Sequence, residues 1–130
     1  MDAGSTPRNN PQKSMFDLCS LEELQRSGGM AFSFRHKERG NHDVGLFWDG
    51  TDIYAIDNWC PHADGFLHEG EISEKRVICP IHHAIFDLTN GRCTNHFTWD
   101  VRSFKTEIID GRIWIDLPDE ESGTRVLRRS

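Results

Sequence analysis

The chain has 130 residues, 36% of them hydrophobic, and a formal net charge of −6 at pH 7. This length fits one domain with its own core, and it leaves little room for a separate nucleotide-binding or substrate-binding domain. The acidic balance excludes nucleic acid as an expected partner, and the absence of a long apolar run excludes a membrane-spanning helix.

The two ends of the chain differ in composition from its middle. Residues 1–14 are polar, contain two prolines and lack the apolar stretch of a secretory signal, which predicts a flexible N-terminal tail and a cytoplasmic location. Residues 119–130 combine three acidic residues with three arginines, and this C-terminal tail is expected either to be disordered or to dock on a partner. One domain is therefore expected over residues 15–118.

Short elements with frequent turns fill the expected domain. After a first strand, the capping-box sequence Ser20-Leu21-Glu22-Glu23 predicts a helical turn over 21–25. Asp49-Gly50 and Asp110-Gly111 are typical of hairpins, because both turn positions must tolerate positive φ, and Asn90-Gly91 marks a further turn. The expected strands cover residues 15–18, 30–34, 44–48, 53–56, 84–88, 106–109 and 112–115. The pattern predicts an all-β domain, either a small sandwich or a small barrel.

Two clusters of cysteine and histidine stand in the middle of this domain. Cys60-Pro61-His62 is a C-x-H arm, and Cys79-Pro80-Ile81-His82 is a C-x2-H arm that follows after sixteen residues. Each arm offers one thiolate and one imidazole, and together they match the ligand set of a Rieske [2Fe–2S] centre. Cys and His ligands also suit a structural zinc ion, although zinc arms usually place roughly two to four residues between their ligands.

The residues around both arms resemble the Rieske family. In that family a C-P-H arm is followed by Gly, which corresponds to Gly65 in this chain. A C-P-x-H arm then precedes a hydrophobic-aromatic-Asp run, which corresponds to Ala84-Ile85-Phe86-Asp87. Thr89-Asn90-Gly91 is similar to the usual Thr-Gly turn, and the resemblance extends from about residue 15 to 117. It implies a Rieske fold, in which a small β-sandwich or barrel base carries an inserted cluster-binding subdomain, here at about residues 58–97.

The resemblance also assigns the ligands of one [2Fe–2S] cluster per chain. It implies that Cys60 and Cys79 bind the buried iron, and that His62 and His82 bind the outer iron with their other ring edges toward solvent. The neighbouring His83 stands where the family usually has Gly, and we interpret it as an exposed imidazole outside the ligand set. The two cysteines outside the arms are expected to stay reduced thiols.

The positions behind the second arm bear on the reduction potential. In high-potential Rieske centres a Ser and a Tyr donate hydroxyl hydrogen bonds to the cluster, and the matching residues here are Ala84 and Phe86, which have no hydroxyl. This predicts a potential toward the low end of a range of about −150 to +300 mV. The segment 92–99 lacks the proline of the family's third loop, and Phe97 or Trp99 is expected to supply the apolar cover instead.

Together with the resemblance, these features predict a one-electron carrier that is not itself an enzyme. Its expected protein partners are an NAD(P)H-dependent flavin reductase and a terminal oxygenase, and the carrier is expected to be a monomer when it is not bound to them. An alternative is the small Rieske subunit of an NAD(P)H-dependent nitrite reductase, and a structural zinc domain is a third. The segment 57–74 holds five acidic residues and no Lys or Arg. It is interpreted either as a solvated loop or as an acidic rim that attracts a basic docking surface.

Overall fold

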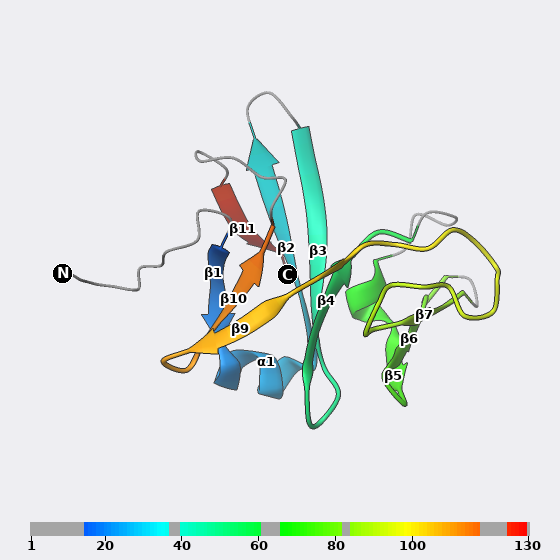
Figure 1. Ribbon diagram of the computed structural model, residues 1–130, viewed down its shortest axis with the longest axis horizontal. Helices are drawn as coiled ribbons and strands as arrows, with labels where there is room; N and C mark the ends of the chain where they lie inside the picture. Colours follow the sequence, from blue (N-terminus) through cyan, green and yellow to red (C-terminus); the bar gives the residue numbers. More distant parts are fainter. Residues whose placement is uncertain (1–14, 37–39, 61–65, 82–83, 118–124, 130) are drawn as a thin grey trace.

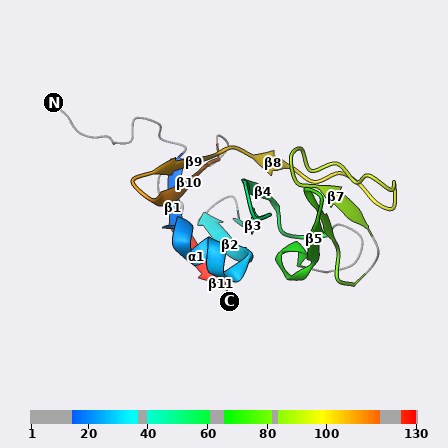
Figure 2. The same cartoon turned by 90° about the horizontal axis from the view of Figure 1, so that it is seen from below.

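The protein was studied as a computed structural model, which describes residues 15–36, 40–60, 66–81, 84–117 and 125–129. Within these residues the strands form three antiparallel sheets. Two sheets belong to a base, and the third forms a smaller unit at the opposite end of the molecule (Figure 1). The same separation is visible from below in Figure 2. The architecture confirms the predicted all-β class.

The base consists of a three-stranded and a five-stranded sheet. The three-stranded sheet has the order β1 (Met15–Ser20), β10 (Arg112–Asp116) and β9 (Thr106–Ile109). The five-stranded sheet has the order β11 (Arg125–Arg129), β2 (Gly29–His36), β3 (Gly40–Trp48), β4 (Ile53–Asp57) and β8 (Ser103–Phe104). The helix α1 (Leu21–Ser27) connects β1 to β2.

The predicted capping box is present at the start of α1. The Ser20 hydroxyl accepts a hydrogen bond from the backbone N–H of Glu23 (3.1 Å), and the Glu23 carboxylate accepts one from the backbone N–H of Ser20 (3.0 Å). The two bonds satisfy N–H groups that have no partner inside the helix. The helix extends two residues beyond the predicted turn, to Ser27.

Both predicted hairpins form, but their turns differ. Asp110 and Gly111 have positive φ angles of 51° and 77° and form the expected two-residue turn between β9 and β10. The β3–β4 turn has four residues, 49–52, because Trp48 pairs with Ile53. There the Asp49 carboxylate accepts hydrogen bonds from the backbone N–H groups of Thr51 (2.8 Å) and Asp52 (2.7 Å), which stabilises the longer turn.

The smaller unit lies between β4 and β8 in the chain. It contains the short 3-10 helix η2 (Leu67–Glu69) and the strands β5 (Glu71–Ser73), β6 (Arg76–Ile78) and β7 (Ile85–Asp87), paired in that order. Sequence patterns did not predict β5 and β6. Their turn consists of Glu74 and Lys75, which have positive φ angles of 52° and 64° without the glycine that usually marks such a turn.

Buried side chains form two hydrophobic clusters. The first core lies in the base and contains Leu18, Cys19, Leu24, Phe32, Phe34, Val44, Leu46, Ala55, Ile113, Ile115 and Leu117. The second core extends from the five-stranded sheet into the smaller unit and contains Phe47, Ile56, Cys60, Leu67, Val77, Cys79, Ala84, Phe86, Leu88 and Cys93. Strand β3 serves both cores because successive side chains point to opposite faces of a sheet. Its residues Val44 and Leu46 belong to the first core and Phe47 to the second.

Part of the predicted C-terminal tail belongs to the base. Residues 125–129 form β11, which pairs with β2 so that Arg129 lies opposite Ala31. This pairing joins segments almost a hundred residues apart, so no local pattern marks it. The predicted N-terminal tail lies outside the described residues, and the limits of the predicted domain stay a prediction. No helix in the described parts of the chain is both long and apolar enough to cross a membrane.

Candidate metal centre

The first predicted arm begins directly after β4. Cys60 is fully buried, while its predicted partner His62 lies outside the described residues. Trp59 forms an isolated β-bridge with Phe66, and their rings meet edge to face with centroids 5.6 Å apart. The bridge closes residues 59–66 at their base, and we call them the first ligand loop.

The second predicted arm lies in the connection between β6 and β7. The backbone N–H of Cys79 donates to the carbonyl oxygen of Ala84 (2.9 Å), which closes residues 79–84 as the second ligand loop. Cys79 is buried. The predicted ligand His82 and the neighbouring His83 lie outside the described residues, so their roles stay predictions.

Backbone pairing brings the two ligand loops together. Strand β5 follows η2 and pairs with β6, which places Glu71 opposite Ile78. At Gly70 the two segments are so close that a Cβ atom would lie 2.1 Å from the carbonyl oxygen of Ile78, so only glycine fits. Cys60 and Cys79 belong to the same second core as a result.

Asp87 organises the turn that follows β7. Its carboxylate accepts hydrogen bonds from the hydroxyl (2.6 Å) and the backbone N–H (2.8 Å) of Thr89, and its carbonyl oxygen accepts one from the N–H of Gly91 (2.7 Å). The hydroxyl of Thr89 holds the pKa of the Asp87 carboxyl below its usual value, and nearby Arg76 and Arg92 add to the effect. The predicted Asn90-Gly91 turn is therefore fixed by a side chain that precedes it.

The chain then runs beside β7 before it returns to the base. Cys93 is buried, forms a β-bridge with Phe86, and donates its backbone N–H to the Asp100 carboxylate (2.8 Å). Phe97 is 44% exposed and Trp99 is 74% exposed. Neither ring is packed into the second core, and their role as an apolar cover stays a prediction.

The acidic segment between the arms is only partly available to a partner. Asp57 is engaged by Arg102, whose Nε and Nη2 lie 3.3 and 3.2 Å from the two carboxylate oxygens. Glu69, Glu71 and Glu74 are exposed, and the remaining acidic residue of the segment lies outside the described residues. Three exposed carboxylates thus lie on the smaller unit itself, whereas Asp57 joins the end of β4 to Arg102, just before β8.

The described part of the predicted ligand set fits an iron–sulfur cluster. Cys60 and Cys79 present two thiols inside one apolar core, and thiolates in a site shielded from solvent are the groups that hold such clusters. No disulfide joins any of the four cysteines, all of which lie in described segments. Within those segments no three His, Cys, Asp or Glu side chains form a metal site, and both predicted histidine ligands lie outside them.

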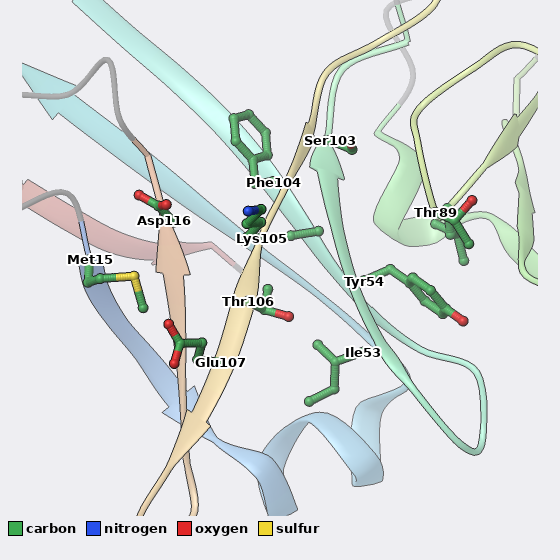
Figure 3. Close-up of a pocket in the computed structure, with 12 residues that line it drawn as sticks. Met15, Ile53, Tyr54, Thr89, Ser103, Phe104, Lys105, Thr106, Glu107 and Asp116 are labelled. Atoms are coloured by element: carbon green, nitrogen blue, oxygen red, sulfur yellow. The ribbon is translucent and has the colours of Figure 1, made fainter. Parts of the chain in front are cut away.

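A surface hollow of about 380 Å³ lies where β4 and the β8–β9 segment meet the turn after β7. Figure 3 shows Tyr54 and Thr89 on one side of it and Glu107 and Asp116 on the other. Neither of the two buried cysteines of the arms is among the described residues that line it. The hollow is therefore separate from the candidate centre.

Two polar residues near the ligand loops had no role predicted from the sequence. Asn58 is fully buried just before the first ligand loop and is hydrogen-bonded to His68 just beyond it. Asp100 accepts the bond from Cys93 described above. The bond between Asn58 and His68 joins residues ten positions apart, and the bond between Cys93 and Asp100 joins residues seven positions apart. No short sequence motif therefore marks either bond.

Comparison with known families identifies the same region of the chain. A family model described as "Rieske [2Fe-2S] domain" matches residues 14–105, which include both ligand loops. The match covers more than half of the chain. It agrees with the two buried thiols and with the two-part fold.

Individual relatives share this region at low identity. The chain is 26% identical over 110 residues to the 3-phenylpropionate/cinnamic acid dioxygenase ferredoxin subunit of Photorhabdus laumondii, covering 83% of this chain and 99% of that protein. It is 30% identical over 110 residues to a nitrite reductase [NAD(P)H] of Emericella nidulans, covering 77% of this chain but only 10% of that enzyme. The solved ferredoxin of carbazole 1,9a-dioxygenase from Nocardioides aromaticivorans superposes with a TM-score of 0.66 at 25% identity, covering 79% of this chain and 97% of that one.

Proposed function

Because this chain belongs to the Rieske [2Fe–2S] domain family, we propose that it passes single electrons from an NAD(P)H-dependent flavin reductase to a terminal oxygenase. The observation that carries this proposal is the placement of Cys60 and Cys79 at the bases of two adjacent loops, inside one apolar core. A carrier needs no substrate pocket beside its cluster, and we propose that the chain has no catalytic activity of its own. A cytoplasmic location and a monomeric state are part of the same proposal.

The proposed ligands divide between the described and the undescribed parts of the loops. Cys60 and Cys79 would hold one iron from within the second core, and His62 and His82 would hold the other. When bound, the cluster takes up and releases one electron. Around the thiols, the fully buried side chains of the second core, Phe86 among them, exclude water from the cysteine side. Electrons are then exchanged on the histidine side.

A low reduction potential is part of the proposal. Ala84 and Phe86 are both fully buried in the second core beside the second ligand loop. Neither side chain has a hydroxyl group that can donate to cluster sulfur, so the additional negative charge of the reduced state is less stabilised. Such a potential suits electron delivery to an oxygenase.

Charge supports a partner with a basic docking surface. Glu69, Glu71 and Glu74 are exposed in the segment that joins the two ligand loops. Opposite charges on the two proteins raise the rate of encounter, and this effect weakens as salt screens it. We expect association with the reductase or the oxygenase to slow as ionic strength rises.

The relation to nitrite reductase supports a second candidate function, as the small subunit of an NAD(P)H-dependent nitrite reductase. In that role the protein stays bound to a large flavin- and sirohaem-containing partner. A stable complex with such a partner, isolated from the source cells, would favour it over a diffusing ferredoxin. A colourless protein that contains zinc and no sulfide would favour the third candidate, a structural zinc domain.

A reconstituted electron-transfer chain tests the leading proposal. NADH and a flavin-dependent ferredoxin reductase from a dioxygenase system should bleach the visible absorption of the protein, and the matching oxygenase with its substrate should restore it. A Cys79→Ser variant of the same protein, which lacks one proposed iron ligand, serves as the control and should show neither change. A fully loaded protein that neither accepts nor donates electrons in this chain would contradict the proposal.

A further inference from the structure

Asn58 is a fully buried polar residue that precedes the first ligand loop and is hydrogen-bonded both to the base and to the residues that follow the loop. Its backbone N–H donates to the carbonyl oxygen of Asp43 in β3 (3.1 Å), which anchors it to the base. Its carbonyl oxygen accepts from the N–H of Leu67 (2.8 Å), and its side-chain Oδ1 accepts from the N–H of His68 (2.7 Å). Its Nδ2 lies 2.8 Å from His68 Nδ1. Asn58, which precedes the first ligand loop, thus binds the two residues that follow the loop, Leu67 and His68.

The hydrogen bonds fix which atoms donate and accept. A backbone N–H can only donate, so the side-chain atom of Asn58 that faces the N–H of His68 is the oxygen. The amide NH2 group then faces the ring and donates to Nδ1. In this arrangement Nδ1 of His68 is the acceptor, because a proton on Nδ1 would oppose the donor of Asn58.

The base sheet is shaped to receive this pair. In β3, a Cβ atom on Gly45 would lie 2.7 Å from Oδ1 of Asn58. In β2, a Cβ atom on Gly29 would lie 2.8 Å from the carbonyl oxygen of His68. A side chain at either position would require Asn58, His68 or, at Gly45, the ring of Phe47 to shift. The two glycines thus let Asn58 and the backbone of His68 pack directly against β3 and β2.

We propose that Asn58 and His68 form a clasp across the base of the first ligand loop, and that His68 is a positioning residue for the ligand Cys60. The proposal rests on the proposed function only in taking Cys60 as a metal ligand. The clasp holds the chain before and after the loop in register with the base, so the thiol of Cys60 stays at its place in the second core. Without the bonds between Asn58 and His68, Cys60 is held less firmly and the metal is released faster.

Two substitutions of His68 distinguish the effect of its hydrogen bond to Asn58 from the effect of packing alone. His68→Leu keeps an apolar body of similar size but leaves the buried NH2 group of Asn58 without its acceptor. His68→Asn is the conservative variant, because its Oδ1 stands where Nδ1 of the ring stood and accepts the same bond. Ile113→Val is the matched control, since it removes one methyl group from the first core without contact to the loop.

The test measures metal release to a chelator from the loaded protein and hydrogen exchange at the amides of Leu67 and His68. His68→Leu should speed both by about tenfold, whereas His68→Asn and Ile113→Val should stay within about twofold of the unchanged protein. Equal rates in His68→Leu and the unchanged protein would overturn the clasp. So would an equal acceleration in His68→Asn or in Ile113→Val. Metal release and hydrogen exchange can be measured whether the bound metal is iron or zinc. Failure of the clasp is therefore distinguishable from failure of the electron-transfer role.

Discussion

Replacing Leu67 by alanine tests whether the second core can be weakened separately from the first. Leu67 is fully buried in the second core, and Leu24 is fully buried in the first, so the two leucines make a matched pair. Each Leu→Ala change removes the same buried methyl groups and should cost about 2–5 kcal/mol of unfolding free energy. At a cost of about 3 kcal/mol, the melting temperature of a domain of this size falls by roughly 10 °C.

The two variants should differ in where the structure opens. With Leu67→Ala, the smaller unit opens while the base stays folded, and amides in β6 and β7 should exchange about a hundredfold faster, because each 1.4 kcal/mol is a factor of ten. With Leu24→Ala, the fastest change should appear in α1 and β2 instead. Hydrogen exchange read by mass spectrometry distinguishes the patterns. Identical exchange maps for the two variants would refute the idea of two separable cores.

Four further substitutions give three more predictions. Ala84→Ser and Phe86→Tyr place hydroxyl groups beside the second ligand loop, so the midpoint potential measured by voltammetry should rise; an unchanged potential would contradict the role given to these positions. Because the pKa of Asp87 is lowered in the folded state, its ionised form stabilises the fold above about pH 4, and this stabilisation is lost as the pH falls through the folded pKa. Asp87→Asn should therefore flatten the acid side of the pH–melting curve, and an unaltered curve would argue against this. Gly70→Ala should push η2 away from β6 and lower the metal content of the purified protein, whereas full loading would show that the close approach is not needed.

The sequence predicted those parts of the fold whose signals are local. Asp110-Gly111 gave a correct two-residue turn because both of its residues adopt positive φ. Asp49-Gly50 gave the correct hairpin and strand ends, but only Gly50 adopts positive φ, because the Asp49 side chain caps two N–H groups and stabilises a four-residue turn. Strands β5 and β6 were missed because three residues are too short for a periodic pattern and because their turn, Glu74-Lys75, lacks glycine.

The spacing of the two arms led to the candidate ligands, whose role as ligands stays a prediction, whereas contacts between distant residues were not predicted. The two arms were enough to select Cys60 and Cys79, which the structure buries together in the second core. His62 and His82 stay predictions, because they lie outside the described residues. The Asn58 bond to His68 was not predicted, since a contact across a loop of ten residues depends on the closed backbone around it.

Iron and acid-labile sulfide content, measured on anaerobically purified protein together with an electron paramagnetic resonance spectrum after dithionite reduction, tests the central claim most directly. The account predicts two irons and two sulfides per chain and a rhombic spectrum with the low average g value of a cluster that has two histidine ligands. Zinc without sulfide, or a cluster whose spectrum shows four cysteine ligands, would contradict it.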